Sequence, residues 1–152
     1  MPPRSPTPYL ATMPSSAPRV SRRSLSLRWS NPLRRAGVRR VMVVGGAGSL
    51  YVAPDQRVLD QPGFPDAYKP EATAGAAFLD ALRRERDLDW TFVSPSAEFV
   101  SGPRTQTFRL GVDELLVDRS GRSWIIFDDY AIAFLDDFES GAHIKQRFTV
   151  GY

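Results

Sequence analysis

The sequence has 152 residues, of which 42% are hydrophobic and 24% charged, a composition typical of one globular domain. It contains no cysteine and one histidine, His143, which excludes disulfide frameworks, thiolate metal sites and cysteine nucleophiles and leaves little support for a histidine-based zinc site or a Ser-His-Asp triad. No apolar run reaches the roughly 18 residues of a spanning helix. We therefore expect a cytoplasmic protein with no membrane partner and no metal site.

The positive charge is concentrated at the N-terminus. Residues 1–40 contain nine arginines and no carboxylate, whereas the residues from 41 onward contain 11 basic and 17 acidic side chains. The net charge of +3 therefore originates in the first 40 residues. It gives no indication of a nucleic-acid surface on the rest of the chain, and we expect no nucleic-acid partner there.

The first 40 residues also contain seven of the 13 prolines and seven serines. Few apolar side chains offset the entropy of ordering such a segment, so we predict a disordered Pro/Arg/Ser-rich leader over residues 1–31 and a folded domain over residues 32–152. The leader lacks the apolar core of a secretory signal. A transit peptide, a polybasic tail that binds nucleic acid, or a start without any function remain open for it.

The regular pattern begins at about Leu33. Residues 33–37 predict the last turn of a helix that is closed by Gly37 in a positive-φ conformation. Residues 38–44 predict a strand that is covered on both faces, because the run is almost continuously apolar. A long loop over residues 50–66 follows, and apolar residues at helical spacing predict a helix over residues 70–86.

The second half of the pattern is richer in β-structure. Residues 90–93 predict a short strand that ends at Ser94 and Pro95, and residues 106–118 and 122–126 predict further β-structure around a turn. A helix is expected over residues 128–139, with Asp128 and Asp129 as favourable charges at its positive end. Residues 147–150 predict a final strand.

This order of elements predicts an α/β fold with a parallel sheet. Two clear parallel strands are too few for a doubly wound sheet, so the sequence predicts a truncated fold. The first strand then has an edge without neighbours, and self-association through that edge is expected.

The glycines at residues 45–48 follow the first strand directly. A dinucleotide fingerprint G-x-G-x-x-G that starts at Gly46 has Tyr51 at its third glycine, and no helix pattern continues after it. The spacing instead indicates a ligand loop at the carboxyl end of a strand, where glycines admit a flat ring and Ser49 offers a hydroxyl. The neighbouring Tyr68 has Ala72 in place of the lysine of a Tyr-x-x-x-Lys pair, so we interpret Tyr68 as a packing residue.

Several segments occur together in a characteristic order: VVGGAGSL (43–50), DAYKPEA (66–72), DLDWTFVSPS (87–96), RT (104–105), FRLG (108–111), DDYA (128–131) and RFTVGY (147–152). As a set they resemble the C-terminal half of atypical short-chain-dehydrogenase-like NAD(P)H-binding proteins, which are described as NADH-flavin reductase-like or as NAD(P)-dependent epimerase-dehydratase-like. The resemblance covers roughly residues 33–152.

The resemblance implies the C-terminal portion of a Rossmann-like parallel sheet, with the N-terminal nucleotide-binding half missing and NAD(P)H binding therefore weak or lost. It implies a small-molecule substrate, such as a flavin, and leaves the catalytic residues unknown. The cofactor-binding residues that it implies face the nicotinamide: Gly45, Gly46, Ala47, Gly48, Ser49, Ser94, Pro95 and Ser96. The substrate-binding residues that it implies are Leu50, Glu98, Phe99 and Arg104.

Each of these residues also has a structural interpretation. Pro95 can simply end a strand, Glu98 and Arg104 can be exposed surface charges, and His143 is expected at the surface rather than in catalysis. For the chain as a whole we expect an oxidoreductase-like protein with weak or no activity. A non-catalytic NAD(P)-sensing module of the same fold and a function carried by the basic leader are the alternatives.

Overall fold

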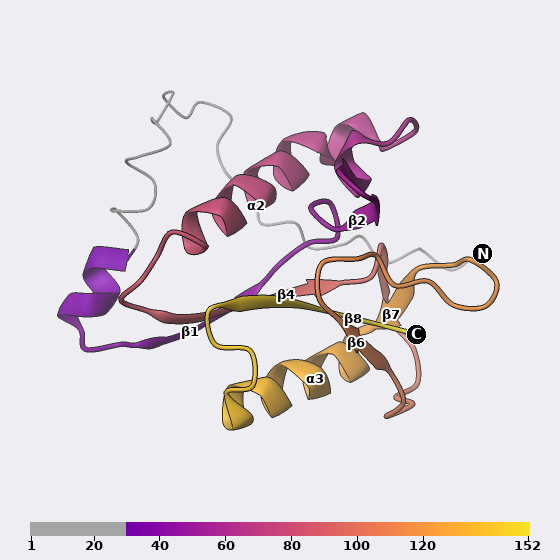
Figure 1. Cartoon of the computed structure of the whole chain (residues 1–152). Helices are drawn as coiled ribbons and strands as arrows, with labels where there is room; N and C mark the ends of the chain where they lie inside the picture. The colour runs from indigo at the N-terminus through magenta and orange to yellow at the C-terminus, as the bar shows by residue number, and fades with distance from the viewer. Residues whose placement is uncertain (1–29) are drawn as a thin grey trace, which may run out of the picture.

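A four-stranded sheet lies at the centre of the computed structural model, which describes residues 30–152 (Figure 1). Its order is β1 (Arg40–Val44), β4 (Asp89–Pro95), β8 (Gln146–Gly151) and β6 (Arg109–Gly111). The first three strands are parallel, and β6 pairs antiparallel with β8. The prediction of an α/β fold with a parallel sheet is confirmed. The expectation of only two clear parallel strands is wrong, because β8 adds a third.

The central strand β4 is longer than the sequence indicates. The strand continues through Ser94, which pairs with Thr149 of β8, and it ends at Pro95 as expected, so it is longer at both ends than the predicted residues 90–93. The carbonyl of Val93 accepts a hydrogen bond from Gly45, so this position faces β1. Pro95, two residues further along, faces the same side at a level where β1 has already ended, and its missing N–H therefore leaves no ladder bond unmade.

One helix covers each face of the sheet (Figure 1). Helix α2 (Lys69–Leu82) buries Leu79 and Leu82 against Trp90 and Phe92 of β4. These apolar side chains each contribute roughly 1.5–3 kcal/mol by leaving water. The predicted helix over residues 70–86 is confirmed up to Leu82, after which the chain forms turns.

Helix α3 (Phe127–Ser140) covers the opposite face. Tyr130 and Ala133 pack against β4 and β8 in a cluster whose strand members are Val93, Phe148 and Val150. The Tyr130 hydroxyl donates to the carbonyl of Val93 at 2.8 Å, and burial raises the pKa of this tyrosine. The helix ends at Gly141, whose φ of +66° is left-handed and whose N–H donates to the carbonyl of Asp137.

The segment predicted as a long loop contains short elements instead. A small hairpin joins β2 (Tyr51–Ala53) to β3 (Gln56–Arg57), with Asp55 at a positive φ of 58° in the turn. The 3-10 turns η1 (Val58–Asp60) and η2 (Asp66–Tyr68) follow and lead into α2. Two-residue strands and single turns carry no hydrophobic period, which is why the sequence pattern does not indicate them.

A second small sheet lies beside the carboxyl end of the central one. It pairs β5 (Glu98–Val100) in parallel with β7 (Trp124–Ile126). Of the β-structure predicted over residues 106–118, only β6 and an isolated bridge at Glu114 form. The prediction of a disordered leader lies outside the described residues, apart from the helical turn over residues 30–35 and Gly37, which adopts the expected positive φ of 73°.

Candidate functional site

A cleft of about 860 Å³ opens where β1 and β4 end. One wall is the loop after β1, a second is the end of β4 with the residues that follow it, and the third is built by residues 58–65 and the first half of α2. Among the residues singled out from the sequence, the following line it: Gly45, Gly46, Ala47, Gly48, Ser49, Pro95, Ser96 and Phe99. The parallel sheet thus brings two loops together that are about 50 residues apart in the sequence.

The glycines of the first loop have different roles. A Cβ at Gly45 would clash with the ring of Phe92, and a Cβ at Gly48 would lie 2.7 Å from the Cβ of Ala72 on α2. These two glycines allow close packing of the loop on its neighbours. Gly46 has no atom within 4 Å of the position that a Cβ would take, so the backbone there borders open space. A flat ring could lie against it without any side chain in the way.

Ser49 lies under the loop and is only partly available to a ligand. Its hydroxyl accepts a hydrogen bond of 2.9 Å from Arg147, which is buried in β8 and also donates from Nε to Asp113 at 2.7 Å. Burial lowers the pKa of Arg147, while the hydrogen bond from its guanidinium to Asp113 opposes this effect. The sequence analysis missed this contact, because nothing in the pattern RFTV distinguishes a buried arginine from an exposed one.

Two predicted site residues lie behind the cleft and do not line it. Leu50 and Ser94 both have side chains that are fully buried. Leu50 packs in the core, so a contact with substrate does not follow from its place. The hydroxyl of Ser94 is buried without a hydrogen-bond partner within residues 30–152, and so is that of Thr149, its register neighbour on β8.

Glu98 and Arg104 lie away from the cleft lining. Glu98 is exposed and accepts a hydrogen bond of 3.0 Å from Arg122 Nε. That hydrogen bond holds the pKa of Glu98 below its usual value. Arg122 also lies over the ring of Trp124 at 4.6 Å. Arg104 is exposed on the loop before β6, as the structural interpretation of both charges anticipated.

Besides Phe99, the cleft contains aromatic side chains that the sequence analysis did not assign to it. They come from three different elements and from the loop before η2: Phe64, Tyr68, Phe78 and Phe92. The interpretation of Tyr68 as a packing residue is wrong, because 52% of its surface is exposed and it lies at the cleft. The signal that could have found it is its place immediately before a helix that faces the glycine loop.

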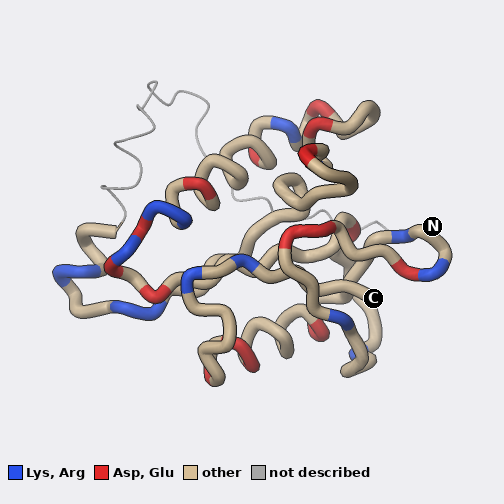
Figure 2. Tube along the Cα trace, in the orientation of Figure 1, with Lys and Arg blue, Asp and Glu red and all other residues tan. Residues whose placement is uncertain are grey.

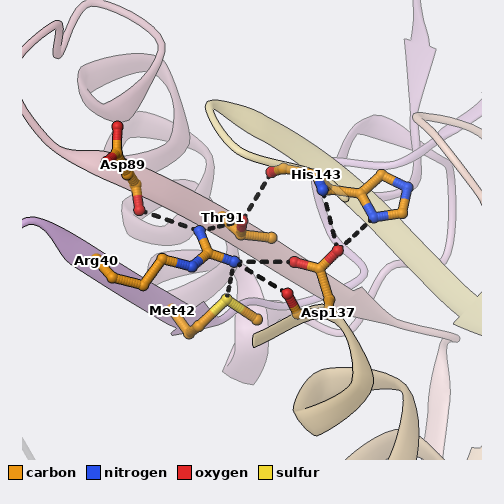
Figure 3. A network of polar contacts seen from close by, with 6 residues as sticks. All are labelled: Arg40, Met42, Asp89, Thr91, Asp137 and His143. Carbon is orange, nitrogen blue, oxygen red and sulfur yellow. Dashed lines mark hydrogen bonds and ion pairs between the residues drawn. The ribbon is translucent and has the colours of Figure 1, made fainter. Parts of the chain in front are cut away.

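His143 belongs to a different part of the molecule, at the amino end of the sheet (Figure 3). Its Nδ1 lies 2.6 Å from Oδ1 of the buried Asp137, and its ring stacks on Phe148. Arg40 donates to the other carboxylate oxygen of Asp137 at 3.0 Å and to the Thr91 hydroxyl at 2.8 Å. The expectation of a surface histidine is therefore wrong, since these contacts half-bury the ring.

The described part of the chain offers no group of three or more His, Asp or Glu side chains that could hold a metal ion. Among the same residues, no helix is both long and apolar enough to cross a membrane. The arrangement is an aromatic-walled cleft with one charged side chain, Glu71, among its described lining residues, at the carboxyl edge of a parallel sheet, a place where ligands bind in open α/β folds.

Comparison with known proteins identifies the fold. No protein-family model matches the chain. The uncharacterised protein YwnB of Bacillus subtilis is 43% identical over 121 residues, which cover 78% of this chain and 57% of YwnB. A solved structure from Burkholderia pseudomallei, assigned as an exported protein, is 47% identical with a TM-score of 0.78 and covers 85% of this chain and 63% of its own. One from Streptococcus pneumoniae, assigned as an NADH-flavin reductase, is 36% identical with a TM-score of 0.72 and covers 90% and 69%.

These similarities define a class of protein with a Rossmann-like NAD(P)-binding fold. The chain belongs to the NAD(P)-binding family that includes the Streptococcus pneumoniae protein, and it shares its fold with short-chain dehydrogenases. Its fold is that of NAD(P)-dependent oxidoreductases. The chain spans less than two thirds of the length of YwnB and of the Burkholderia pseudomallei protein.

Proposed function

We propose that this protein contributes the nicotinamide and substrate side of an NAD(P)H-dependent oxidoreductase site that reduces a flavin or a similar planar acceptor. The observation that carries the proposal is the cleft between the loop after β1 and the end of β4. Both loops follow parallel strands, where an open α/β sheet binds its ligands. The Streptococcus pneumoniae relative, assigned as an NADH-flavin reductase, suggests the class of acceptor.

The residues in the cleft fit the ring end of the cofactor. Gly46 borders open space, and Pro95 and Ser96 form the opposing wall. In this proposal the nicotinamide lies between the two loops, held by Gly45, Gly46, Ala47, Gly48 and Ser49 on one side and by Pro95 and Ser96 on the other. Ser94 is buried behind this wall and does not contact the cofactor in this proposal. Of the predicted substrate-binding residues, we keep only Phe99, which lines the cleft.

The described lining residues of the cleft do not provide cationic side chains for the phosphate groups of the cofactor. None of the cleft-lining residues among those described is a lysine or an arginine. We therefore assign the phosphate and adenine contacts to the portion of the relatives that has no counterpart in this chain, and we expect the chain alone to bind NAD(P)H weakly. In this proposal the folded domain comprises residues 32–152. We also propose that it is cytoplasmic, which cell fractionation would test.

The protein needs little acid-base chemistry for such a reaction. When bound, a dihydronicotinamide supplies a hydride that passes directly to an acceptor ring in the same cleft. The glycine loop then sets the distance between the two rings, and Phe64, Phe92 and Phe99 exclude water from them. This role of orientation accounts for a cleft without a paired acid and base among its described residues.

The substitution Gly46→Leu tests the proposal. It places a side chain at a position whose Cβ has no atom within 4 Å, so the fold should remain and ligand binding should be lost. We expect millimolar NADPH to raise the melting temperature of the unmodified chain slightly and to leave that of Gly46→Leu unchanged. Ala131→Leu, a similar enlargement at an exposed position of α3, serves as the control and should keep the NADPH response.

A second measurement separates the enzyme from a sensor. NADPH oxidation with a flavin acceptor, lost in Gly46→Leu and kept in Ala131→Leu, supports the oxidoreductase. Binding of NADPH without oxidation by flavins or quinones favours the non-catalytic sensing module. An equal response of the unmodified chain and Gly46→Leu to NADPH would show that the cleft is not the cofactor site.

A further inference from the structure

The cleft is almost free of charge. Of its lining residues within residues 30–152, Glu71 is the one with a charged side chain. It lies in the first turn of α2, it is exposed, and it takes part in none of the ion pairs of the described chain. Its negative charge therefore acts on whatever ligand occupies the cleft.

Arg147 and Lys69, two cations near the cleft, do not offset this charge. Arg147 lies beneath the glycine loop, but its guanidinium is bound to Asp113 and to the Ser49 hydroxyl. Lys69 opens α2, where both signs of charge occur along the trace (Figure 2), but it is exposed and does not line the cleft. Glu71 also opposes the positive end of the α2 dipole, which would otherwise attract an anion.

The walls, in contrast, suit a planar ring. Phe64 and Tyr68 lie on one side of the cleft and Phe92 and Phe99 on another, so a flat aromatic molecule can pack against ring faces and edges. A phosphate attached to such a molecule would meet a carboxylate instead of a cation. The lining therefore favours the ring system of a phosphorylated flavin and disfavours its phosphate.

We propose that Glu71 makes this cleft selective for an uncharged planar acceptor, such as riboflavin or a quinone, over the same ring carrying a phosphate. The inference rests on the proposed function, since it names the acceptor class of that site. Riboflavin and FMN share one ring system and differ by a phosphate of about −1.5 to −2 charges at neutral pH. Their comparison measures the effect of the phosphate, and the Glu71→Gln variant tells how much of that effect comes from Glu71.

The test measures quenching of flavin fluorescence as the chain is titrated into riboflavin or FMN. At low salt, riboflavin should bind about threefold to tenfold more tightly than FMN, and the ratio should shrink at high salt because ions screen the repulsion. In Glu71→Gln the ratio should approach one through tighter FMN binding, with riboflavin affinity unchanged. Asp66→Asn, which neutralises a nearby carboxylate of η2 that does not line the cleft, should keep the ratio of the unmodified chain.

The outcomes distinguish this inference from the proposed function. Equal affinities for both flavins, or a ratio that Glu71→Gln leaves unchanged, overturn the selectivity while flavin binding itself stands. If neither flavin binds although NADPH still raises the melting temperature, both the selectivity and the flavin acceptor are wrong, and the nicotinamide site remains. Tighter binding of FMN than of riboflavin would show a cation at the cleft and overturn the inference directly.

Discussion

Asp129 shows how a residue can fit a local rule and yet do something else. It lies in the first turn of α3, where a carboxylate is expected to favour the helix N-terminus. The structure shows no side-chain cap there. Instead the fully buried carboxylate accepts hydrogen bonds from the backbone and hydroxyl of Thr105, from the N–H of Gln106 and from the Tyr152 hydroxyl at 2.6 Å. Asp129 thus lies in the first turn as expected, but its carboxylate fixes the loop before β6 and the last residue of the chain rather than capping the helix.

Replacement of Asp129 by Asn tests this role. Because an amide would turn its NH2 group toward several donors, we expect Asp129→Asn to lower the free energy of unfolding by about 2–4 kcal/mol at pH 7. Asp128→Asn, at the exposed neighbouring position, should change it by less than about 0.5 kcal/mol. Urea denaturation followed by tryptophan fluorescence measures both. Equal stabilities of the two variants would contradict the buried role.

The same residue predicts a dependence on pH. Burial alone would raise the pKa of Asp129, but the hydrogen bonds from Thr105, Tyr152 and Gln106 hold it below its ordinary value. A carboxyl with a lowered folded-state pKa stabilises the protein above its unfolded-state pKa, and this contribution disappears as the pH falls through the folded-state value. The stability difference between the unmodified chain and Asp129→Asn should therefore be largest near neutrality and shrink in acid below about pH 4.

Among the elements, α3 is held at its C-terminal end by polar contacts with two other parts of the fold. Asp137 is buried, and its carboxylate binds Arg40 of β1 and both the ring and the backbone N–H of His143 (Figure 3). The helix is thereby joined to β1 and to the turn before β8, and Arg40 in turn donates to Thr91 of β4. Apolar packing holds its middle, as Tyr130 and Ala133 show.

We expect Asp137→Asn to destabilise the chain by about 2–4 kcal/mol, because it leaves the partly buried guanidinium of Arg40 without its counter-charge. The matched control is Asp136→Asn, the adjacent exposed carboxylate, with an effect below about 0.5 kcal/mol. Hydrogen exchange should become faster in the last turn of α3 in the first variant alone. Unchanged exchange there would show that apolar packing is sufficient to hold this end of the helix.

Two features of the described residues favour association with a second chain. No strand pairs with the outer edge of β1 within the described chain. On α3, Phe127, Leu135 and Phe138 are 47–57% exposed and share one side of the helix with Ala131. An open edge and an exposed apolar stripe are both features that favour association.

We propose that the chain self-associates through the open edge of β1 and the apolar stripe of α3. Its average mass should rise from the monomer value between micromolar and submillimolar concentration in sedimentation equilibrium. The double substitution Leu135→Lys with Phe138→Lys should shift the chain back to the monomer, because it places two charges in the apolar stripe. The control Asp136→Lys adds a cation to the polar side of the same helix and should leave association in place. A monomeric unmodified chain over the whole range would contradict the proposal.

The sequence by itself determined the α/β class, the positions of the main helices and strands within a few residues, and the two loops that meet at the cleft. These features follow from hydrophobic period and from glycine and proline chemistry, which act over a few neighbouring residues. The family resemblance placed Gly45–Ser49 and Pro95–Ser96 at one site, and a parallel sheet, in which loops after adjacent strands share one edge, agrees with that assignment.

Only the tertiary structure decided which side chains surround that site. Ser49 and Arg147 meet across 98 residues, Glu98 is held outside the cleft by Arg122, and Tyr68 and Glu71 line it because α2 crosses over the glycine loop. Such contacts depend on how the helices and loops pack on the sheet, and packing is decided by many distant residues together rather than by any local pattern.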